Sequence, residues 1–161
     1  MEERPELRVL RRLREEGKVL AAAESCTGGL IAKRMTDLPG ASQVFCGGVV
    51  SYTNEVKARV LRVPDALLDR FGAVSEPVAR AMAEGVCAVT GADVGVSVTG
   101  VAGPDRDDRG NPVGTVYLAV SCAGRTDCRR FAFGETLSRA AIRDCAADAA
   151  FALVLEALSA P

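Results

Sequence analysis

Two short apolar segments of this chain each run straight into a polar loop that contains glycine. The first segment, residues 18–23, ends in the loop Glu24–Gly29, and the second, residues 93–98, ends in the loop Thr99–Asp105. A helical pattern resumes after the first loop, at residues 30–35. Strands that alternate with helices form open, largely parallel sheets, which bind ligands at the carboxyl ends of their strands. We therefore expect both loops to meet at one ligand-binding edge.

The remaining segments predict an α/β protein with two antiparallel strands late in the chain. Apolar residues at helical spacing indicate four more helices, which start near Pro5, Asn54, Pro64 and Ser75. Residues 113–122 and 126–133 flank Ala123-Gly124-Arg125, which is typical of a hairpin turn. An alanine-rich closing helix is expected over Thr136–Leu158. Together these segments predict a single domain, residues 1–161, that folds as a three-layer α/β/α sandwich around a mixed, mostly parallel sheet.

Composition excludes several classes of function. The net charge of -1 gives no electrostatic basis for binding nucleic acid. The six cysteines show no CxxC spacing and the chain has no histidine, so neither a zinc site nor a disulfide framework is expected. No apolar run approaches the ~20 residues that span a bilayer. We expect a soluble cytoplasmic protein that uses no metal or other cofactor and binds neither membrane nor nucleic acid.

Proton transfer in this chain must rely on groups other than histidine. A tyrosine and a lysine, Tyr52 and Lys57, lie on either side of the pair Thr53-Asn54, which is typical of a helix cap after a strand. Ser42 lies a short distance before that strand. Spacing alone also allows ordinary roles, namely a turn serine, a strand tyrosine with a satisfied hydroxyl and a solvated lysine.

The first glycine loop also has the features of an anion site. The first N–H groups of a helix lack partners, and the helix dipole favours an anion there. The loop adds hydroxyl groups and open backbone through Ser25, Thr27, Gly28 and Gly29. The same loop would serve equally as a helix cap with no ligand. Arg139 and Arg143, four apart near the start of the closing helix, are either surface residues or partners for a phosphate at this edge.

Five segments, in order along the chain, resemble motifs of the CinA C-terminal domain family: A-E-S-C-T-G-G (23–29), G-G-V-V-S-Y-T-N-E-V-K (47–57), G-A-V-S-E-P-V (72–78), V-T-G-V-A-G-P-D (98–105) and P-V-G-T-V (112–116). The resemblance implies hydrolysis of nicotinamide mononucleotide to nicotinate mononucleotide and ammonia, in pyridine-nucleotide recycling. Some relatives carry this domain behind a molybdopterin-binding-like domain. The chain begins one helix before the motif region, so it resembles the free-standing form. Many family members are dimers or larger, which implies a homo-oligomer.

The resemblance also implies roles for individual residues. In this family a serine nucleophile is assisted by a tyrosine and a lysine, and the matching positions are Ser42, Tyr52 and Lys57. A serine hydroxyl needs a base, and a desolvated lysine can be neutral and accept a proton, either directly or through the tyrosine.

Other matched positions suggest substrate contacts. Thr99 matches a family position that lines the site, and Arg139 matches the arginine of a G-D-R segment, with Arg143 as its substitute. Backbone N–H groups of Gly100 or of the Ser25–Gly29 turn are the candidates for holding the oxyanion or the phosphate.

Two segments depart from the family pattern. The loop after A-G-P-D is usually glycine-rich, but here residues 106–110 read R-D-D-R-G, and the G-D-R segment is longer, G-E-T-L-S-R, over residues 134–139. A non-catalytic nucleotide-binding or regulatory module is therefore an alternative to the amidohydrolase. A metal-dependent phosphohydrolase is a third alternative, for which the chain offers the carboxylates Asp105, Asp107 and Asp108.

Overall fold

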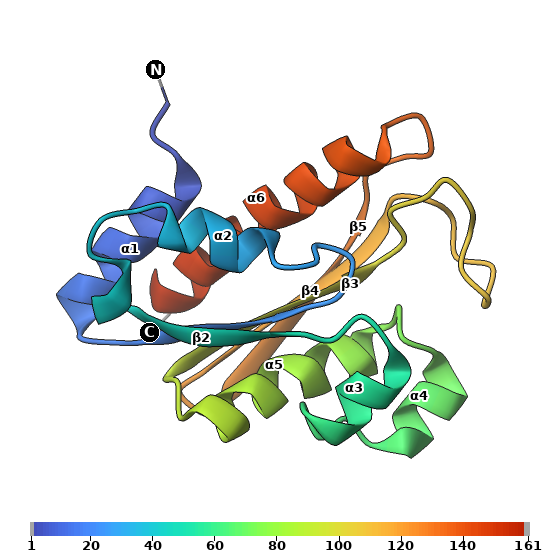
Figure 1. Cartoon of the computed structure of the whole chain (residues 1–161), viewed down its shortest axis with the longest axis horizontal. Coiled ribbons are helices and arrows are strands. Elements are labelled where there is room, and N and C mark those ends of the chain that lie inside the picture. Colours follow the sequence, from blue (N-terminus) through green and yellow to red (C-terminus); the bar gives the residue numbers. More distant parts are fainter. Residues whose placement is uncertain (1, 160–161) are drawn as a thin grey trace.

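A five-stranded mixed sheet with helices on both faces forms the centre of the computed structural model, which describes residues 2–159 (Figure 1). The strands, in the spatial order β2-β1-β3-β4-β5, are β2 (Phe45–Val50), β1 (Leu20–Glu24), β3 (Val94–Gly100), β4 (Thr115–Cys122) and β5 (Arg125–Ala132). β1 is parallel to both of its neighbours, whereas β4 is antiparallel to β3 and to β5. This confirms the predicted α/β class, the mixed sheet and the late hairpin.

The helices form one layer on each face of the sheet (Figure 1). One layer contains α1 (Pro5–Glu16), α2 (Leu30–Thr36) and α6 (Arg139–Ser159). The other contains α3 (Asn54–Arg59), α4 (Asp65–Phe71) and α5 (Glu76–Thr90). A short 3-10 turn, Ala41–Gln43, precedes β2. None of the helices in the described range 2–159 has the length and apolar character needed to cross a bilayer.

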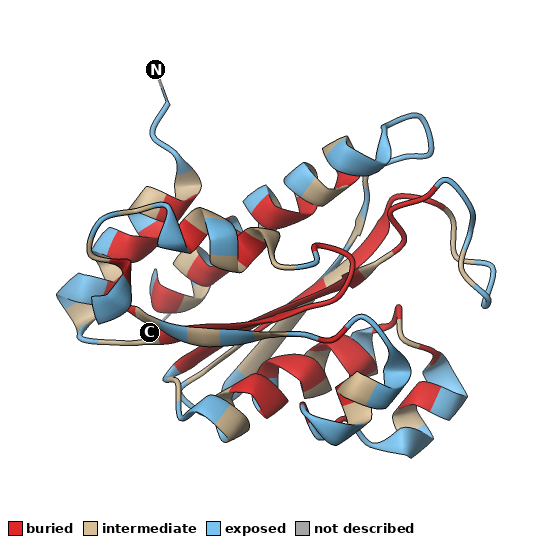
Figure 2. Ribbon diagram, viewed as in Figure 1, coloured by how far each residue is buried: buried red, intermediate tan, exposed pale blue. Residues whose placement is uncertain are grey.

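Small residues allow the helices to approach the sheet closely. β1 is buried along its whole length, and Figure 2 shows buried residues along the sheet and the inner faces of the helices. A Cβ at Gly95 of β3 would lie 2.4 Å from the carbonyl oxygen of Ala83 in α5. A Cβ at Gly85 of α5 would lie 1.9 Å from the carbonyl oxygen of Leu61. A chain with only 4% aromatic residues thus builds its core by close backbone approach as well as by side-chain volume.

The closing helix starts later than its composition predicts. The expected start was Thr136, but α6 begins at Arg139. The reason is a cap, because the Oγ of Ser138 accepts a hydrogen bond from the N–H of Ala141 at 3.1 Å. Arg139 is consequently the first helical residue, at the end of the sheet where β3 finishes.

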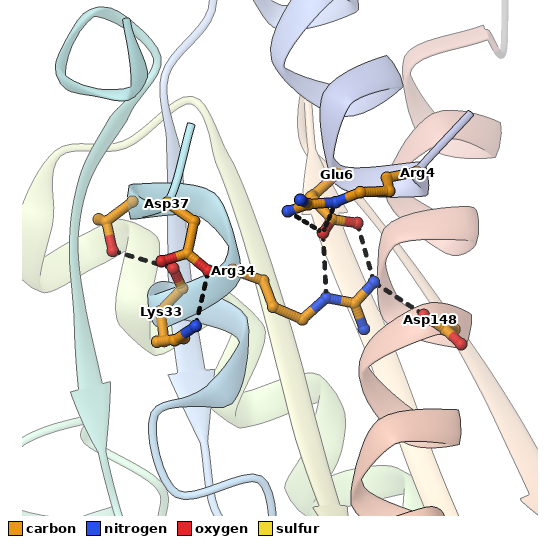
Figure 3. Close-up of polar contacts among 7 residues, drawn as sticks. Arg4, Glu6, Lys33, Arg34, Asp37 and Asp148 are labelled. Atoms are coloured by element: carbon orange, nitrogen blue, oxygen red, sulfur yellow. Dashed lines mark hydrogen bonds and ion pairs between the residues drawn. The ribbon is translucent and has the colours of Figure 1, made fainter. Parts of the chain in front are cut away.

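An ion-pair network joins the three helices of one layer (Figure 3). Arg34 of α2 pairs with Glu6 of α1 and with Asp148 of α6, each at 2.8 Å. Glu6 is buried and is also paired with Arg4 at 2.9 Å. The guanidinium of Arg34 lies 5.0 Å from the ring centroid of Phe151 in α6. The network fixes α2, and with it the glycine loop that precedes α2.

Candidate active site

A hollow of about 270 Å³ opens at the carboxyl ends of the parallel strands. Its walls come from the loops after β1, β2 and β3, from the segment before α5 and from the first residue of α6. The two glycine loops meet here as predicted, because β1 and β3 are parallel neighbours with Glu24 opposite Val98. Ser25 from the first loop and Thr99 at the end of β3 both line the hollow.

Lys57 lies at the bottom of this hollow with only 1% of its surface exposed. Its helix, α3, is capped by Thr53, whose side chain accepts a hydrogen bond from the N–H of Val56 at 3.3 Å. The Nζ of Lys57 donates to the Oγ of Ser25 at 2.9 Å and to the carbonyl oxygen of Ser51 at 2.6 Å. Burial lowers the pKa of Lys57 to about 8, so an appreciable fraction of this amine is neutral near pH 7. The arrangement therefore provides a base in contact with a serine hydroxyl.

Ser25 is held at the first position after β1. Its N–H donates to the carbonyl oxygen of Val98 at 3.0 Å, which continues the pairing of β1 with β3. The N–H of the next residue, Cys26, donates to no backbone carbonyl oxygen within residues 2–159. Burial raises the pKa of Cys26 to about 11, so its side chain stays a neutral thiol. Ser25 is thus the nucleophile in this loop, and Cys26, the residue that follows it, also lines the hollow.

The structure separates Ser42 from the residues with which it was grouped. Ser42 lies in the 3-10 turn before β2 and is exposed, where it lines a different hollow, together with Phe45 and Cys46. Lys57 and Tyr52 follow the other end of β2. Six residues of extended strand span about 20 Å. The predicted contact of Ser42 with Tyr52 and Lys57 is therefore wrong, and Ser25 is the serine that contacts Lys57.

Tyr52 lies at the mouth of the hollow, with 57% of its surface exposed. Its hydroxyl accepts a hydrogen bond from the Nη2 of Arg139 at 2.7 Å, and the Nη1 of Arg139 donates to the carbonyl oxygen of Gly103. Thr99 is buried, and its Oγ1 donates to the carbonyl oxygen of Ala73 at 2.8 Å. Tyr52 is thus engaged with Arg139 at the rim, and Thr99 holds one wall of the hollow in place.

A buried carboxylate of the protein occupies the predicted anion site at the start of α2. Glu24 is 1% exposed, and its two carboxylate oxygens accept the N–H groups of Ile31 at 2.9 Å and Ala32 at 3.1 Å. The carbonyl oxygen of Glu24 accepts the N–H of Ser51 at 2.7 Å. Glu24 therefore orders the start of α2, and through Ser51 it also supports an acceptor of Lys57.

The turn itself serves structure rather than a phosphate. Thr27 is fully buried, and neither Thr27 nor the glycines Gly28 and Gly29 line the hollow. Arg143 donates to the carbonyl oxygens of Cys26 and Thr27 at 3.1 and 2.9 Å. Thr27, Gly28 and Gly29, which were expected to contact substrate, instead form a capping turn, because Glu24 satisfies the N–H groups at the start of α2 and Arg143 binds the carbonyl groups of the turn. Gly100, by contrast, lines the hollow as expected.

Sequence reasoning missed several residues of the site. Ala73 and Val74, from the segment before α5, line the hollow, and so does Asn54, which was expected only as part of a helix cap. Asp105 and Asp107 line it as well, although the sequence suggested them only as metal ligands. Ala73 and Val74 belong to the motif G-A-V-S-E-P-V, which was interpreted only as the start of a helix. No group of three or more acidic, cysteine or histidine side chains is placed to hold a metal ion within residues 2–159.

Comparison with known proteins identifies similar chains. The family model described as CinA C-terminal domain matches residues 2–158. A CinA-like protein of Geobacter sulfurreducens is 54% identical over 135 residues, which cover 84% of this chain and 32% of that protein. The chain spans about a third of the length of the curated relatives that it matches.

Solved structures share the whole fold. A competence-damaged protein (CinA) superfamily protein from Klebsiella pneumoniae superposes with a TM-score of 0.92 at 34% identity and covers 96% of both chains. The competence/damage inducible protein CihA from Agrobacterium tumefaciens gives a TM-score of 0.91 at 36% identity, over 97% of this chain and 94% of that one.

Proposed function

This chain belongs to the CinA C-terminal domain family, and we propose that it is a cytoplasmic amidohydrolase of pyridine-nucleotide recycling. The proposed reaction is hydrolysis of the carboxamide of nicotinamide mononucleotide, which yields nicotinate mononucleotide and ammonia. One observation carries the proposal above the others, namely the buried contact between Lys57 and Ser25. Burial lowers the pKa of Lys57, so this amine is a suitable base for the serine hydroxyl that it contacts.

The geometry supports a mechanism in two stages. Neutral Lys57 takes the hydroxyl proton of Ser25 while the Oγ attacks the carboxamide carbon. The N–H of Cys26, which lines the hollow, would stabilise the negative charge that develops on the carboxamide oxygen. The protonated Lys57 then gives its proton to the departing nitrogen, which leaves as ammonia. An acyl ester on Ser25 remains, and a water molecule that Lys57 deprotonates hydrolyses it, which restores the hydroxyl.

The rim of the hollow supports a nucleotide phosphate as the other end of the substrate. Arg143 does not line the hollow, and it donates to the backbone of the first loop. Arg139 lies at the mouth beside Tyr52, where a guanidinium can pair with a phosphate in a bidentate manner. We therefore assign the phosphate to Arg139 and the carboxamide to Ser25.

The test is ammonia release from nicotinamide mononucleotide by the purified protein, compared with its Ser25→Ala variant. We expect steady release by the wild type and none above the buffer rate by the variant. If the wild type releases none but the nucleotide raises its melting temperature, the chain is a nucleotide-binding module and the enzymatic proposal fails. We also propose a homo-oligomer, which light scattering on the same preparation tests.

A further inference from the structure

The connection between β3 and β4 forms an outer wall of the candidate active site. Its residues 103–112, here called the strap, extend away from the sheet (Figure 1, yellow). Asp105 and Asp107 of the strap line the hollow. The strap contains the charged stretch R-D-D-R-G, residues 106–110. Its charged residues therefore call for a physical explanation.

Asp107 organises the tip of the strap from within. Its Oδ1 accepts the N–H groups of Arg109 at 3.2 Å and Asn111 at 2.7 Å. Its Oδ2 accepts the side-chain amide of Asn111 at 2.7 Å. Side-chain acceptors of this kind close tight turns. The tip is thus a defined turn that presents the side chain of Arg109 outward.

Arg109 attaches this turn to the end of α4. Its guanidinium donates to the carbonyl oxygens of Leu68 at 3.4 Å, Asp69 at 2.5 Å and Arg70 at 3.2 Å. The last carbonyl groups of a helix lack intrahelical partners and carry partial negative charge, so a cation is favourable there. The side chain also lies across Gly72, where an added Cβ would be 2.9 Å from the Cγ of Arg109.

This attachment joins two walls of one hollow. The strap contributes Asp105 and Asp107, and the segment directly after Gly72 contributes Ala73 and Val74. Arg109 does not line the hollow itself, so it touches no bound substrate there. Its three hydrogen bonds instead set the distance between the strap and the segment before α5.

We propose that Arg109 is a positioning residue that anchors the strap to α4 and thereby sets the width of the substrate site. The inference rests on the proposed function, because the substrate whose binding it governs is the one assigned above. The anchor does not change the position of the reacting carboxamide, which we place beside Ser25 at the opposite wall of the hollow. Arg109 therefore contributes to substrate affinity and leaves the chemical step unchanged.

The experiment compares wild type, Arg109→Ala, Arg109→Lys and the control Arg125→Ala. Arg125 is an exposed arginine at the start of β5, and it pairs with Asp127. The first readout is kinetic, with nicotinamide mononucleotide as substrate. We expect Arg109→Ala to raise KM about fivefold with kcat within about twofold of wild type. Arg109→Lys should raise KM less than Arg109→Ala does, because its ammonium keeps the positive charge. It should not restore the wild-type KM, because one ammonium cannot bind three carbonyl groups as a guanidinium does.

The second readout is the rate at which a protease that cuts before aspartate cleaves the strap in the folded protein. Arg109→Ala should be cut there at least about threefold faster than wild type and Arg125→Ala. Equal cleavage rates, or a lower kcat with an unchanged KM, would overturn the proposal. A wild type that releases no ammonia would instead contradict the proposed function, and the proteolysis would still decide whether Arg109 anchors the strap.

Discussion

The Nζ of Lys57 lies 2.9 Å from the Oγ of Ser25, although 32 residues separate the two in the chain. Both groups lie at the bottom of a hollow whose walls come from five segments. Through this contact, the serine hydroxyl of a glycine loop and the lysine amine of a short helix can act together as nucleophile and base. The predictions below follow from this pair and from the residues that support it.

Ser25 and Ser42 should differ sharply when each is replaced by alanine. Ser25→Ala removes the hydroxyl that contacts Lys57, so kcat should fall about a thousandfold or more. Ser42 is exposed and lines another hollow, so Ser42→Ala should stay within about twofold of wild type. Ammonia release at saturating substrate measures both. The opposite pattern, with the loss confined to Ser42→Ala, would remove Ser25 from the mechanism.

The rate should rise with pH because the base is active in its neutral form. Burial lowers the pKa of Lys57 to about 8, so below pH 8 the neutral fraction increases tenfold per pH unit. We expect kcat/KM to rise toward pH 8 and to level off above it. Lys57→Met replaces the amine with an apolar side chain of similar length, so this variant should be inactive at every pH. A flat profile of the wild type between pH 6 and 9 would rule out Lys57 as the base.

The same lowered pKa predicts how stability depends on pH. Between about pH 8 and the ordinary lysine pKa of 10.5, the folded protein has lost the Lys57 proton while the unfolded chain retains it. The unfolded state then binds more protons, so the free energy of unfolding rises with pH in this window. The rise should be on the order of 3 kcal/mol and absent from Lys57→Met. Urea titrations of both proteins at pH 7.5 and 10 measure the difference, and parallel curves would contradict it.

Glu24→Gln should weaken both the fold and the reaction. The amide keeps one acceptor oxygen but loses the second, so the N–H of Ile31 or of Ala32 loses its partner at the start of α2. We expect a loss of about 1–2 kcal/mol in the free energy of unfolding and a lower kcat, because Ser25 directly follows Glu24. Glu55→Gln, at an exposed ion pair on α3, is the control. Equal stability of the two variants would show that the buried cap contributes little.

Glu6→Gln tests the network that positions α2. Burial alone would raise the pKa of Glu6, but hydrogen bonds from Arg34 and Arg4 and the charge of Arg34 lower it on balance. Because the pKa of Glu6 is lower in the folded state, its ionised carboxylate stabilises the fold above the unfolded-state pKa of 4.5. That stabilisation is lost as the pH falls through the folded-state pKa. At pH 7 the substitution should cost about 1–3 kcal/mol, and the difference should shrink in acid.

The matched control is Glu3→Gln, which removes an exposed pair with Arg11. Exposed pairs contribute about 0–1 kcal/mol, so this variant should unfold close to the wild type. Thermal and urea unfolding at pH 7 and pH 4 separate the two cases. Equal losses for Glu3→Gln and Glu6→Gln would show that burial of Glu6 adds nothing.

Local rules on the sequence were enough to predict most of the architecture. Apolar runs that end in glycine loops predicted β1 and β3 and their shared edge, because parallel neighbours bring their carboxyl ends together. The pair Thr53-Asn54 identified the start of α3 by its capping preference. The predicted start of α6 was a few residues too early. Residues with helical propensity continue before Ser138, but Ser138 caps the helix and α6 begins at Arg139.

By itself the sequence determined the family, the α/β class and the set of groups available for catalysis, since these depend on residue identity and on periodicity along the chain. Only the tertiary structure decided which serine meets Lys57. β1 and β2 are parallel neighbours with Glu24 opposite Val50, so the residues that follow the two strands come together at one edge. Ser25 follows β1 and Lys57 follows β2, whereas Ser42 precedes β2 and lies at the opposite edge. Strand direction, which no local pattern encodes, places Ser25 against the lysine.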